Sequence, residues 1–565
     1  MTDLAAPAPK RLRVGLSTDD LYMRAGLVLL VLVLVVILAL PLWALLSKGF
    51  QNRDGQFVGL ANYIAYFSTP ALFHSALNSL HVAAVCTAIV VPLSFLYAYA
   101  LTRTVLPMRW LFQGIALIPI FAPSLLPGLA LIYLFGNQGF FKALIGGEIY
   151  GFWGIVIAQV FYCLPHATMI LVTALATADA RLYEAADALG ASKLRIFFTV
   201  TLPGARYGII SAALVVFTLV ITDFGIAKVI GGNFNVLATD VYKQVIGQQN
   251  FSMGAVVGMV LLAPAALAFI VDRLVQRKQV ALLTARAVPL IPKPHASRDF
   301  FFAAFCTVVC LGILGILGMA IWGSLIQYWP YNLTLTLNNY NFGNFDSNGW
   351  GSYFNSLEMA AGAAIIGTTI MFVGAWLNEK TRGFFLMRGL IQFLAFLPMA
   401  VPGLVLGLGY IFFFNAPTNP LNVLYGTMAI LVINTIAHFY TVGHLTATTA
   451  LKQIDPEFES VSASLKVPVW RTFTRVTVPI CLPSTLDIAI YMFVNAMTTV
   501  SSVIFLYAPD TKLASVAAVN IEETGATAAA AALCIVIVAT SAAVKALHIV
   551  AERLLLHKWQ AWRRR

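Results

Sequence analysis

The chain has 565 residues, of which 60% are hydrophobic and only 10% are charged, and its mean hydropathy is +0.85. Soluble domains carry about 25% charged residues, so this composition excludes a soluble globular protein. The net charge of +12 is spread over many short segments rather than gathered in one basic patch. We therefore expect no nucleic-acid partner.

Apolar segments long enough to cross a bilayer recur along the whole chain. A helix of about 20 apolar residues spans the roughly 30 Å hydrocarbon core. The expected fold is therefore an all-α integral membrane protein embedded in lipid. We predict about twelve transmembrane helices, centred near residues 36, 88, 123, 164, 218, 264, 314, 365, 400, 435, 494 and 537.

The distribution of basic residues predicts the orientation of these helices. If the N-terminus is cytoplasmic, the inner segments hold 29 of the 35 Lys and Arg residues, and the outer loops hold 6. Cytoplasmic loops of membrane proteins carry such an excess of Lys and Arg. We therefore expect a multi-pass protein with both termini in the cytoplasm.

The sequence contains an internal duplication. The spacing from Asn62 to Asn78 recurs from Asn339 to Asn355, and both segments end in Asn-Ser-Leu. The pattern P-x-x-x-P-G-L occurs in "APSLLPGLAL" and again in "LPMAVPGLVL", 275 residues later. "DARLYEAADALGASKLRIFFTVTLP" aligns without a gap to "DPEFESVSASLKVPVWRTFTRVTVP", 276 residues later. Three matches in the same order at nearly one offset indicate two copies of one unit.

Each copy holds about six spans, so both copies enter the membrane in the same orientation. Parallel repeats of this kind are related by an axis along the membrane normal. We expect two parallel six-helix repeats with a pseudo-two-fold along that normal. The predicted segments are a cytoplasmic tail (1–24), a first repeat (25–275), a cytoplasmic linker (276–299), a second repeat (300–552) and a basic cytoplasmic tail (553–565).

A charged loop interrupts the apolar sequence once in each repeat, at 179–203 and at 455–479. In the first copy, Asp179 is a good helix N-cap and Gly190 can take the positive φ that ends a helix. We expect two short helices with a bend, lying on the inner face of the membrane. In the second copy, Asp455 and Pro456 begin the helix, and we expect Pro468 to end it, since the residue before a proline avoids helical geometry. A helix pair that merely connects spans is the alternative.

The first charged loop resembles the EAA motif of ATP-binding-cassette (ABC) importer permeases. The resemblance extends to nearly the whole chain, because each half has six spans with this loop before its fifth. It implies that the loops are coupling helices that dock on a cytoplasmic ABC ATPase homodimer, with ATP and Mg on those partner subunits. The matching residues are Glu184, Ala185, Ala186, Gly190, Val200, Leu202 and Pro203.

The sequence agrees with a separate motor, since it contains no G-x-x-x-x-G-K-[ST] motif for ATP phosphates. We therefore expect a transport subunit rather than an enzyme, with no catalytic residues and no cofactor of its own. The second loop departs from the motif: Ser460 stands in the place of Glu184 and Lys466 in the place of Gly190, while Glu459 is shifted by one and Pro479 is retained. We expect unequal docking, with Glu184 the stronger anchor.

Polar residues near the outer ends of spans five and eleven are the candidates for the transport path. Asp223 follows Thr222 in "VITDFGIAK", which resembles the E-F-G of permeases for oxyanions and iron, and ionisable residues within spans are functional candidates by default. A purely structural Asp is the alternative. The corresponding residues of the second repeat are Thr498 and Thr499, and Asn495 lies one turn earlier.

Two further features bear on function. The P-x-x-x-P-G patterns are expected to break or kink spans three and nine, which is tolerated where a helix is buried or lines a cavity. No metal-ligand spacing occurs among the histidines, so we expect no metal site. The outer loop from Gln327 to Asn355 is rich in Tyr, Trp, Phe and Asn, which suits either contact with a solute-binding protein or anchoring at the membrane surface.

The sequence as a whole resembles single-chain permeases with two fused EAA halves, such as those for ferric iron, thiamine and 2-aminoethylphosphonate. We expect a bacterial inner-membrane importer subunit that receives solute from a periplasmic binding protein and works by alternating access. The resemblance is greatest to the 2-aminoethylphosphonate type, with ferric iron, thiamine or another small solute as alternatives. An ion-coupled secondary transporter is a further alternative, although it would carry more carboxylates within the membrane.

Overall fold

The computed structural model describes residues 18–145, 148–280, 288, 290–381 and 383–556, and the description below is confined to them. Almost all of this part of the chain is helical, and its one β-sheet is a two-stranded hairpin of β1 (Ile326–Tyr328) and β2 (Asn332–Leu335). Ten helices are long and apolar enough to cross a membrane, and two bent helix pairs bring the total to twelve. The predicted all-helical membrane fold is confirmed.

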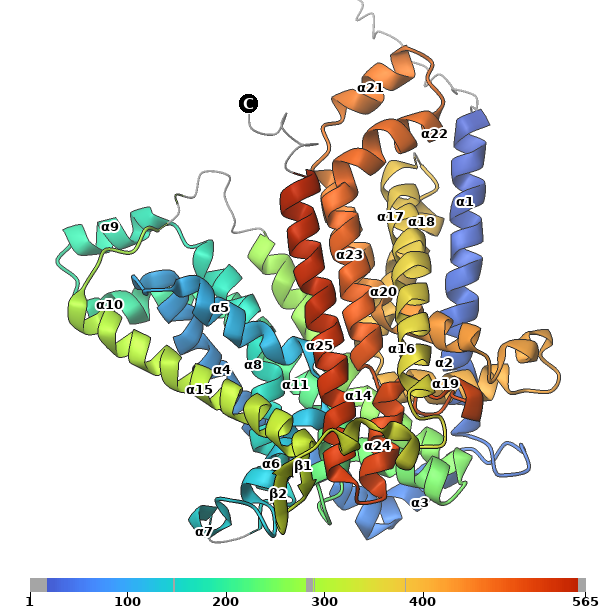
Figure 1. Cartoon of the computed structure of the whole chain (residues 1–565). Coiled ribbons are helices and arrows are strands. Elements are labelled where there is room, and N and C mark those ends of the chain that lie inside the picture. The colour runs from blue at the N-terminus through green and yellow to red at the C-terminus, as the bar shows by residue number, and fades with distance from the viewer. Residues whose placement is uncertain (1–17, 146–147, 281–287, 289, 382, 557–565) are drawn as a thin grey trace, which may run out of the picture.

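Six spans make up the first half of the molecule (Figure 1). The first span runs through α1 and α2 with a π turn between them, and the third is the bent pair α5 and α6. In chain order the helices are α1 (Thr18–Leu34), α2 (Leu40–Lys48), α4 (Pro70–Arg103), α5 (Arg109–Leu117), α6 (Leu125–Phe135), α8 (Phe152–Ala176), α11 (Leu202–Thr222) and α14 (Phe251–Val280).

The second half repeats this order. Its second span is formed by α16 and α17 around a π turn, and its third is the bent pair α18 and α19. The helices are α15 (Ala296–Leu325), α16 (Gly351–Gly362), α17 (Thr368–Lys380), α18 (Phe385–Ala400), α19 (Gly403–Phe414), α20 (Met428–Lys452), α23 (Val478–Thr498) and α25 (Thr527–Ala551).

Short helices cover the two ends of the bundle. The loops at 179–203 and 455–479 lie at the same end of the molecule, at the top of Figure 1, as parallel repeats require. These loops contain α9 (Ala180–Ala188) and α10 (Lys193–Ile196), and α21 (Glu457–Ser464) and α22 (Val469–Thr472). The opposite end carries α3 (Ala61–Ser68), α7 (Lys142–Ile145), α12 (Gly225–Ile230), α13 (Leu237–Tyr242) and α24 (Ala514–Glu523) with the β-hairpin.

Matching hydrogen bonds in the two halves explain the repeated asparagines. Asn78 donates to the carbonyl of Asn235 at 3.0 Å, and Asn355 donates to the carbonyl of Lys512 at 3.0 Å. Both bonds tie the start of the second span to the segment after the fifth. Asn62 and Asn339 likewise each donate to two carbonyls at the end of the first span, those of Gly49 and Gln51, and of Ser324 and Ile326.

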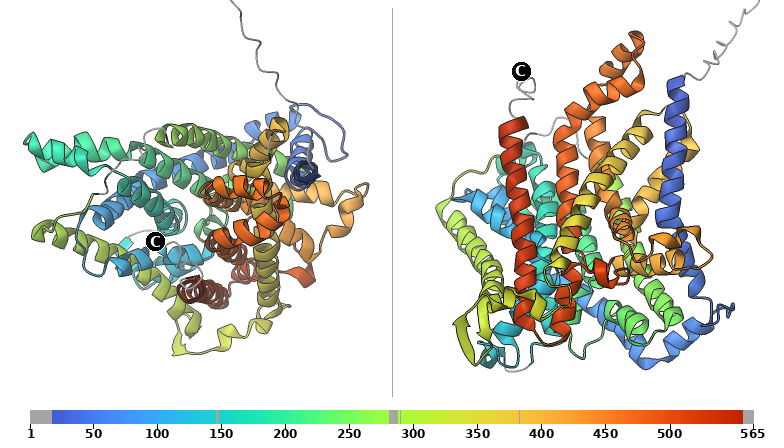
Figure 2. Two further views of the ribbon diagram at one scale, coloured as in Figure 1. Left: turned by 90° about the horizontal axis from the view of Figure 1, so that it is seen from above. Right: turned by 45° about the vertical axis from the view of Figure 1, so that its right-hand side comes forward.

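The first span of each half packs on the other half. The α1 helix lies against α17 and α18, and α2 lies against α19. Figures 1 and 2 show α1, in blue, beside the yellow helices of the second half. In return, α15 packs against α4, α5 and α6 of the first half. The two halves are therefore interlocked, and one half would expose the apolar faces that the other half covers.

Helices continue beyond several predicted boundaries. The α1 helix begins at Thr18, where Asp19 and Asp20 in its first turn are favourable at the positive end of the helix dipole. The α14 helix reaches Val280 and α15 begins at Ala296, so both ends of the predicted linker are helical. The rest of the linker at 281–287 and 289, and the tail residues 1–17 and 557–565, lie outside the described part of the chain.

Candidate functional site

Both halves line one cavity within the membrane region. Its volume is about 390 Å³, and its walls come from α8, α11 and α12 in the first half and from α18, α19, α20 and α23 in the second. All five transport-path candidates line it: Thr222, Asp223, Asn495, Thr498 and Thr499. The structure thus brings together residues that the sequence places about 275 positions apart.

Asp223 stands where α11 ends and the backbone turns into α12. Its carboxylate accepts hydrogen bonds from the Gln159 Nε2 atom and the Ile226 backbone N–H, both at 3.0 Å. Thr499 has the same place after α23, and its Oγ1 atom lies 3.2 Å from the Ser502 Oγ atom. Asp223 therefore supports the local backbone in addition to giving the cavity a carboxylate.

The breaks in the two bent spans also face the cavity. The third span bends by 102° between α5 and α6, and the ninth bends by 115° between α18 and α19. Ser124 lines the cavity at the first break, and residues 398–403 line it at the second. The P-x-x-x-P-G patterns thus do more than kink two helices, because they bring irregular backbone to a polar cavity, where its free groups can be hydrated.

Several aromatic and imidazole side chains of the cavity escaped the sequence analysis. Tyr162 and His438 occupy the same place in the two repeats, 276 residues apart, and both line the cavity with His166 and Tyr491. The repeat offset would have revealed this pair, had it been applied to every polar residue within a span. Among the described residues, no group of three or more His, Cys, Asp and Glu side chains is placed to hold a metal ion.

The first charged loop contains the expected capped helix. The Asp179 side chain accepts from the Arg181 backbone N–H at 3.1 Å, and α9 then carries Glu184, Ala185 and Ala186. Gly190 has φ +71° and ends the helix, as predicted.

The second charged loop ends its helix differently from the prediction. Pro468 does not stop α21, which ends at Ser464, and Lys466 takes the left-handed conformation with φ +53°. The Val467 N–H bonds the Ser462 carbonyl at 3.0 Å, as the Ala191 N–H bonds the Ala186 carbonyl in the first loop. The shared turn of the fold overrides the preference of lysine for negative φ, and Pro468 instead precedes α22.

The variant Lys466→Gly is expected to stabilise the second loop by about 1 kcal/mol, because glycine has no Cβ to strain at positive φ. Hydrogen exchange should show amides 462–467 opening about 5-fold less often, which is the same free energy. The reverse variant, Gly190→Lys, should destabilise the first loop by a similar amount. Unchanged exchange in both loops would mean that neither position is strained.

The second short helix of each loop merges with a span instead of standing apart. The α10 and α22 helices continue through π turns at Phe197–Thr201 and Phe473–Thr477 into α11 and α23. Pro203 and Pro479 follow these turns directly. Proline lacks an N–H and its ring collides with the carbonyl four residues earlier, so a widened turn accommodates it. Leu202 and Pro203 therefore begin a span, which gives the loop a rigid connection to the cavity wall.

Both loops present the same exposed apolar surface. Leu189 is 87% exposed and Leu465, at the same repeat position, is 70% exposed. Exposed apolar groups that recur at matched positions indicate a partner surface. The matched pairs, here called the docking leucines and their neighbours, are Leu182 with Phe458, Leu189 with Leu465, and Leu194 with Trp470.

A cation at the inner end of each second span braces the loop of the same half. The Arg103 guanidinium lies over the Tyr183 ring, 5.3 Å from its centroid, and Lys380 pairs with Glu459 at 2.5 Å. Tyr183 and Glu459 are equivalent in the two repeats, and each stands directly before the position of the motif glutamate. The two halves keep this contact with different chemistry, a cation–π contact in one and an ion pair in the other.

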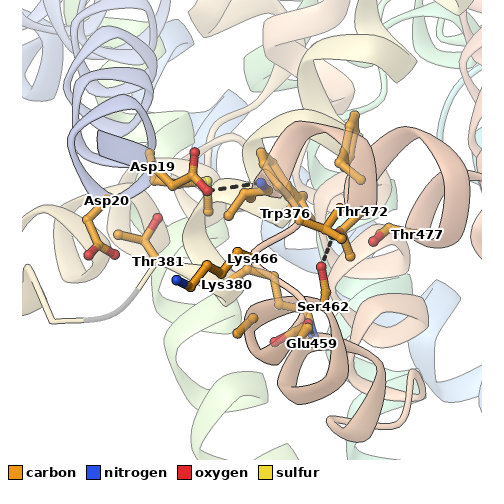
Figure 3. A pocket seen from close by; sticks show the side chains of 15 residues that line it. Asp19, Asp20, Trp376, Lys380, Thr381, Glu459, Ser462, Lys466, Thr472 and Thr477 are labelled. Carbon is orange, nitrogen blue, oxygen red and sulfur yellow. Dashed lines mark hydrogen bonds and ion pairs between the residues drawn. The ribbon is translucent and has the colours of Figure 1, made fainter. Parts of the chain in front are cut away.

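The second loop is also tied to the start of the chain's first helix. The Asp19 carboxylate accepts from the Val469 N–H at 3.1 Å, and the Ser462 and Thr472 hydroxyls hydrogen-bond to each other (Figure 3). These residues surround a pocket of about 490 Å³ that separates α21 from α17. Movement of this loop would therefore reach both α1 and α17.

The comparisons with known proteins were made against this geometry. The sequence profile of the binding-protein-dependent transport system inner membrane component family matches residues 90–280 and 370–554, more than half of the chain. Each matched segment contains one charged loop and one wall of the cavity. The chain belongs to this family. It is a fused type I ABC permease with two copies of the family's domain in one polypeptide.

Individual relatives agree with this assignment. A candidate ferric transport system permease protein of Haemophilus influenzae is 28% identical over 540 residues, covering 91% of this chain and 82% of that protein. A ferric transport system permease protein of Actinobacillus pleuropneumoniae is 30% identical over 76% of this chain and 64% of its own length. A spermidine/putrescine transport system permease homologue of Mycoplasma genitalium is 28% identical over 31% of this chain and 59% of its own length.

The two loops of this permease differ where the motif glutamate stands. Glu184 is exposed, and its side chain has no hydrogen-bond or ion-pair partner among the described residues, so it is free for a partner subunit. Ser460 already donates to the Pro456 carbonyl at 3.2 Å. Glu459, the shifted acid, is occupied by Lys380.

The variant Glu184→Ala is therefore expected to reduce uptake by about 10-fold or more, whereas Ser460→Ala should change it less than about 2-fold. A hydrogen bond to a charged group contributes about 1.5–3 kcal/mol, which supports the larger effect. Initial rates of solute uptake at equal membrane expression are the measurement. Equal losses in the two variants would show that the loops dock alike.

Proposed function

We propose that this permease forms the membrane pathway of an ATP-driven importer, with an ABC ATPase homodimer docked on its two coupling loops, residues 179–203 and 455–479. The observation that carries the proposal is the matched set of exposed apolar side chains on the two loops. Two equivalent sites call for a partner with two equivalent clefts, because a symmetric dimer presents the same surface twice. The positive-inside distribution supports loops and termini in the cytoplasm of a bacterial cell, below its inner membrane.

The closed outer end supports alternating access around the cavity. Lys228 of α12 pairs with Glu523 of α24 at 2.6 Å, and the Tyr242 and Phe505 rings stack 6.3 Å apart. Both contacts join the first half to the second at the end opposite the coupling loops. The halves would separate here to admit solute, and the ATPase dimer would drive that change through α11 and α23.

A periplasmic binding protein is the proposed donor of solute. The hairpin between α15 and α16 exposes Tyr328 and Tyr331, which stack 5.8 Å apart, at 64% and 75%. Rigid aromatic side chains are enriched at the centres of protein interfaces. Anchoring of the hairpin in lipid headgroups is the alternative, and loss of binding-protein affinity on truncating both rings to alanine would distinguish the two.

The proposed solute is small and polar and carries a cationic centre that Asp223 can meet. In 2-aminoethylphosphonate that centre is the ammonium group, and the cavity's hydroxyl and imidazole groups suit the phosphonate oxygens as donors. Ferric iron is the second candidate, since two relatives are named as ferric transport permeases. Carboxylate and phenol oxygens also suit this hard cation, and Asp223, Tyr162 and Tyr491 supply them.

Uptake of labelled 2-aminoethylphosphonate and of ferric iron, measured side by side in cells with and without this chain, tests the proposal. Loss of phosphonate uptake alone on deletion would support the first solute, and loss of iron uptake alone would support the second. Uptake of both that persists after deletion would contradict both assignments.

A further inference from the structure

A small pocket at the outer end of the first half has the chemistry of an anion site. Its volume is about 340 Å³, and it lies where the end of α2, the start of α14 and the end of α19 meet. Lys48 and Arg53 both line it, and they are two of only six basic residues that the charge distribution assigns to the outer loops. No Asp or Glu lines this pocket.

The two cations are unpaired within the described part of the chain, since neither side chain makes an ion pair or a hydrogen bond there. Lys48 is half-buried and Arg53 is exposed. Two neighbouring cations without a counter-charge repel each other, and a bound anion removes that repulsion. The pocket is thus electrostatically incomplete as it stands.

A buried hydroxyl gives a second and independent indication. Ser252 is 4% exposed and lines the pocket, yet its Oγ atom has no hydrogen-bond partner. An unsatisfied buried hydroxyl costs about 1–3 kcal/mol. Serines in helices usually bond a carbonyl of the preceding turn, so an unpaired one at a pocket wall has the placement of a ligand donor.

The pocket also lies at the N-terminus of a long helix. Phe251 and Ser252 are the first two residues of α14, and the first N–H groups of a helix have no partner within it. Their partial positive charge favours anions at this end. Asn415 and Gln249 add amide groups to the pocket lining.

The equivalent place in the second half lacks these features. Gly323 corresponds to Lys48 and Ala528 to Ser252, and the five residues that follow Leu325 include no cation. The rings of Trp322, Trp329 and Phe140 pack together there instead. The cationic pocket is thus specific to the first half and is not demanded by the shared fold.

We propose that this pocket binds a phosphate-type oxyanion, held by Lys48 and Arg53, the Ser252 hydroxyl and the start of α14. The group is supplied either by a lipid headgroup or by a soluble phosphate or phosphonate. Phe251 and Phe412, whose rings meet edge to face at 6.2 Å, form an apolar wall that would suit the start of a lipid chain. The proposal does not depend on the identity of the transported solute.

The test uses the purified full-length chain and compares wild type with the double variant Lys48→Gln/Arg53→Gln, with Ser252→Ala, and with Lys142→Gln as a control. Lys142 is also an outer basic residue, but its Nζ atom bonds the Asn137 carbonyl and lies outside this pocket. In one arm, native mass spectrometry counts phosphatidylglycerol retained from nanodiscs of equal phosphatidylglycerol and phosphatidylcholine. In the other, ³¹P NMR line broadening measures inorganic phosphate and 2-aminoethylphosphonate binding in phosphatidylcholine nanodiscs.

We expect the double variant to weaken binding at least 10-fold in one of the two arms, Ser252→Ala to weaken it about 3-fold, and Lys142→Gln to match wild type. Loss confined to retained phosphatidylglycerol assigns the site to a lipid headgroup, and loss confined to the soluble anions assigns it to a free oxyanion. Equal behaviour of wild type, the double variant and Ser252→Ala in both arms would overturn the proposal.

Discussion

The double variant Leu189→Asp/Leu465→Asp is expected to abolish binding of the ATPase dimer and, with it, ATP-driven uptake. Leu189 and Leu465 project from the ends of α9 and α21 at 87% and 70% exposure. Burying a leucine in a partner is worth about 2 kcal/mol, and a carboxylate in the same cleft adds a desolvation cost. Losing roughly 4 kcal/mol over two sites corresponds to about 1000-fold in affinity.

Binding of the purified permease to its ATPase, followed by biolayer interferometry, measures this effect directly. The variant Leu337→Asp is a matched control, because Leu337 is 72% exposed but lies beside the hairpin at the opposite end of the molecule. It should bind the ATPase as wild type does. Retention of the complex by the double variant would mean that the partner docks elsewhere.

The variant Asp223→Asn is expected to reduce solute uptake by about 100-fold while leaving the ATPase complex intact. Asparagine keeps an oxygen that can accept from Gln159 and from the Ile226 N–H, so the turn into α12 is preserved and mainly the charge is removed. A charged contact with a cationic solute centre is worth about 1.5–3 kcal/mol, which is a factor of roughly 10–150.

Initial uptake rates at matched expression are the readout, with Thr222→Val as the companion variant. The Thr222 Oγ1 atom donates to the Thr218 carbonyl at 2.8 Å, so this hydroxyl is already satisfied by its own helix. Its removal should cost less than about 3-fold. Wild-type uptake by Asp223→Asn would show that the carboxylate serves the fold and does not meet solute.

Most of the architecture could be predicted because the chain encodes it twice. Long apolar segments, the asymmetry of Lys and Arg, and the repeat offset each constrain the fold independently, and all three agree. The offset also brought Asp223 and Thr499 together before any coordinates were known. Duplication turns sequence alignment into spatial information, since equivalent residues of two parallel repeats meet around the axis between them.

The features that the sequence could not predict depend on contacts between distant segments. Nothing near Lys466 signals a left-handed residue, because the turn there is imposed by the packing of the whole loop. The pairing of Lys380 with Glu459 joins the end of one span to a loop about 80 residues later. The interlocked first spans likewise depend on which apolar face covers which, and apolar faces carry little specificity in sequence.

Uptake by proteoliposomes tests the central claim most directly. The permease and its ATPase are reconstituted with ATP trapped on the side of the coupling loops and with loaded binding protein on the other side. The account predicts solute uptake that requires this ATP and that is lost with Leu189→Asp/Leu465→Asp. Uptake that proceeds without ATP, driven by an ion gradient alone, would contradict it and would identify the chain as a secondary transporter.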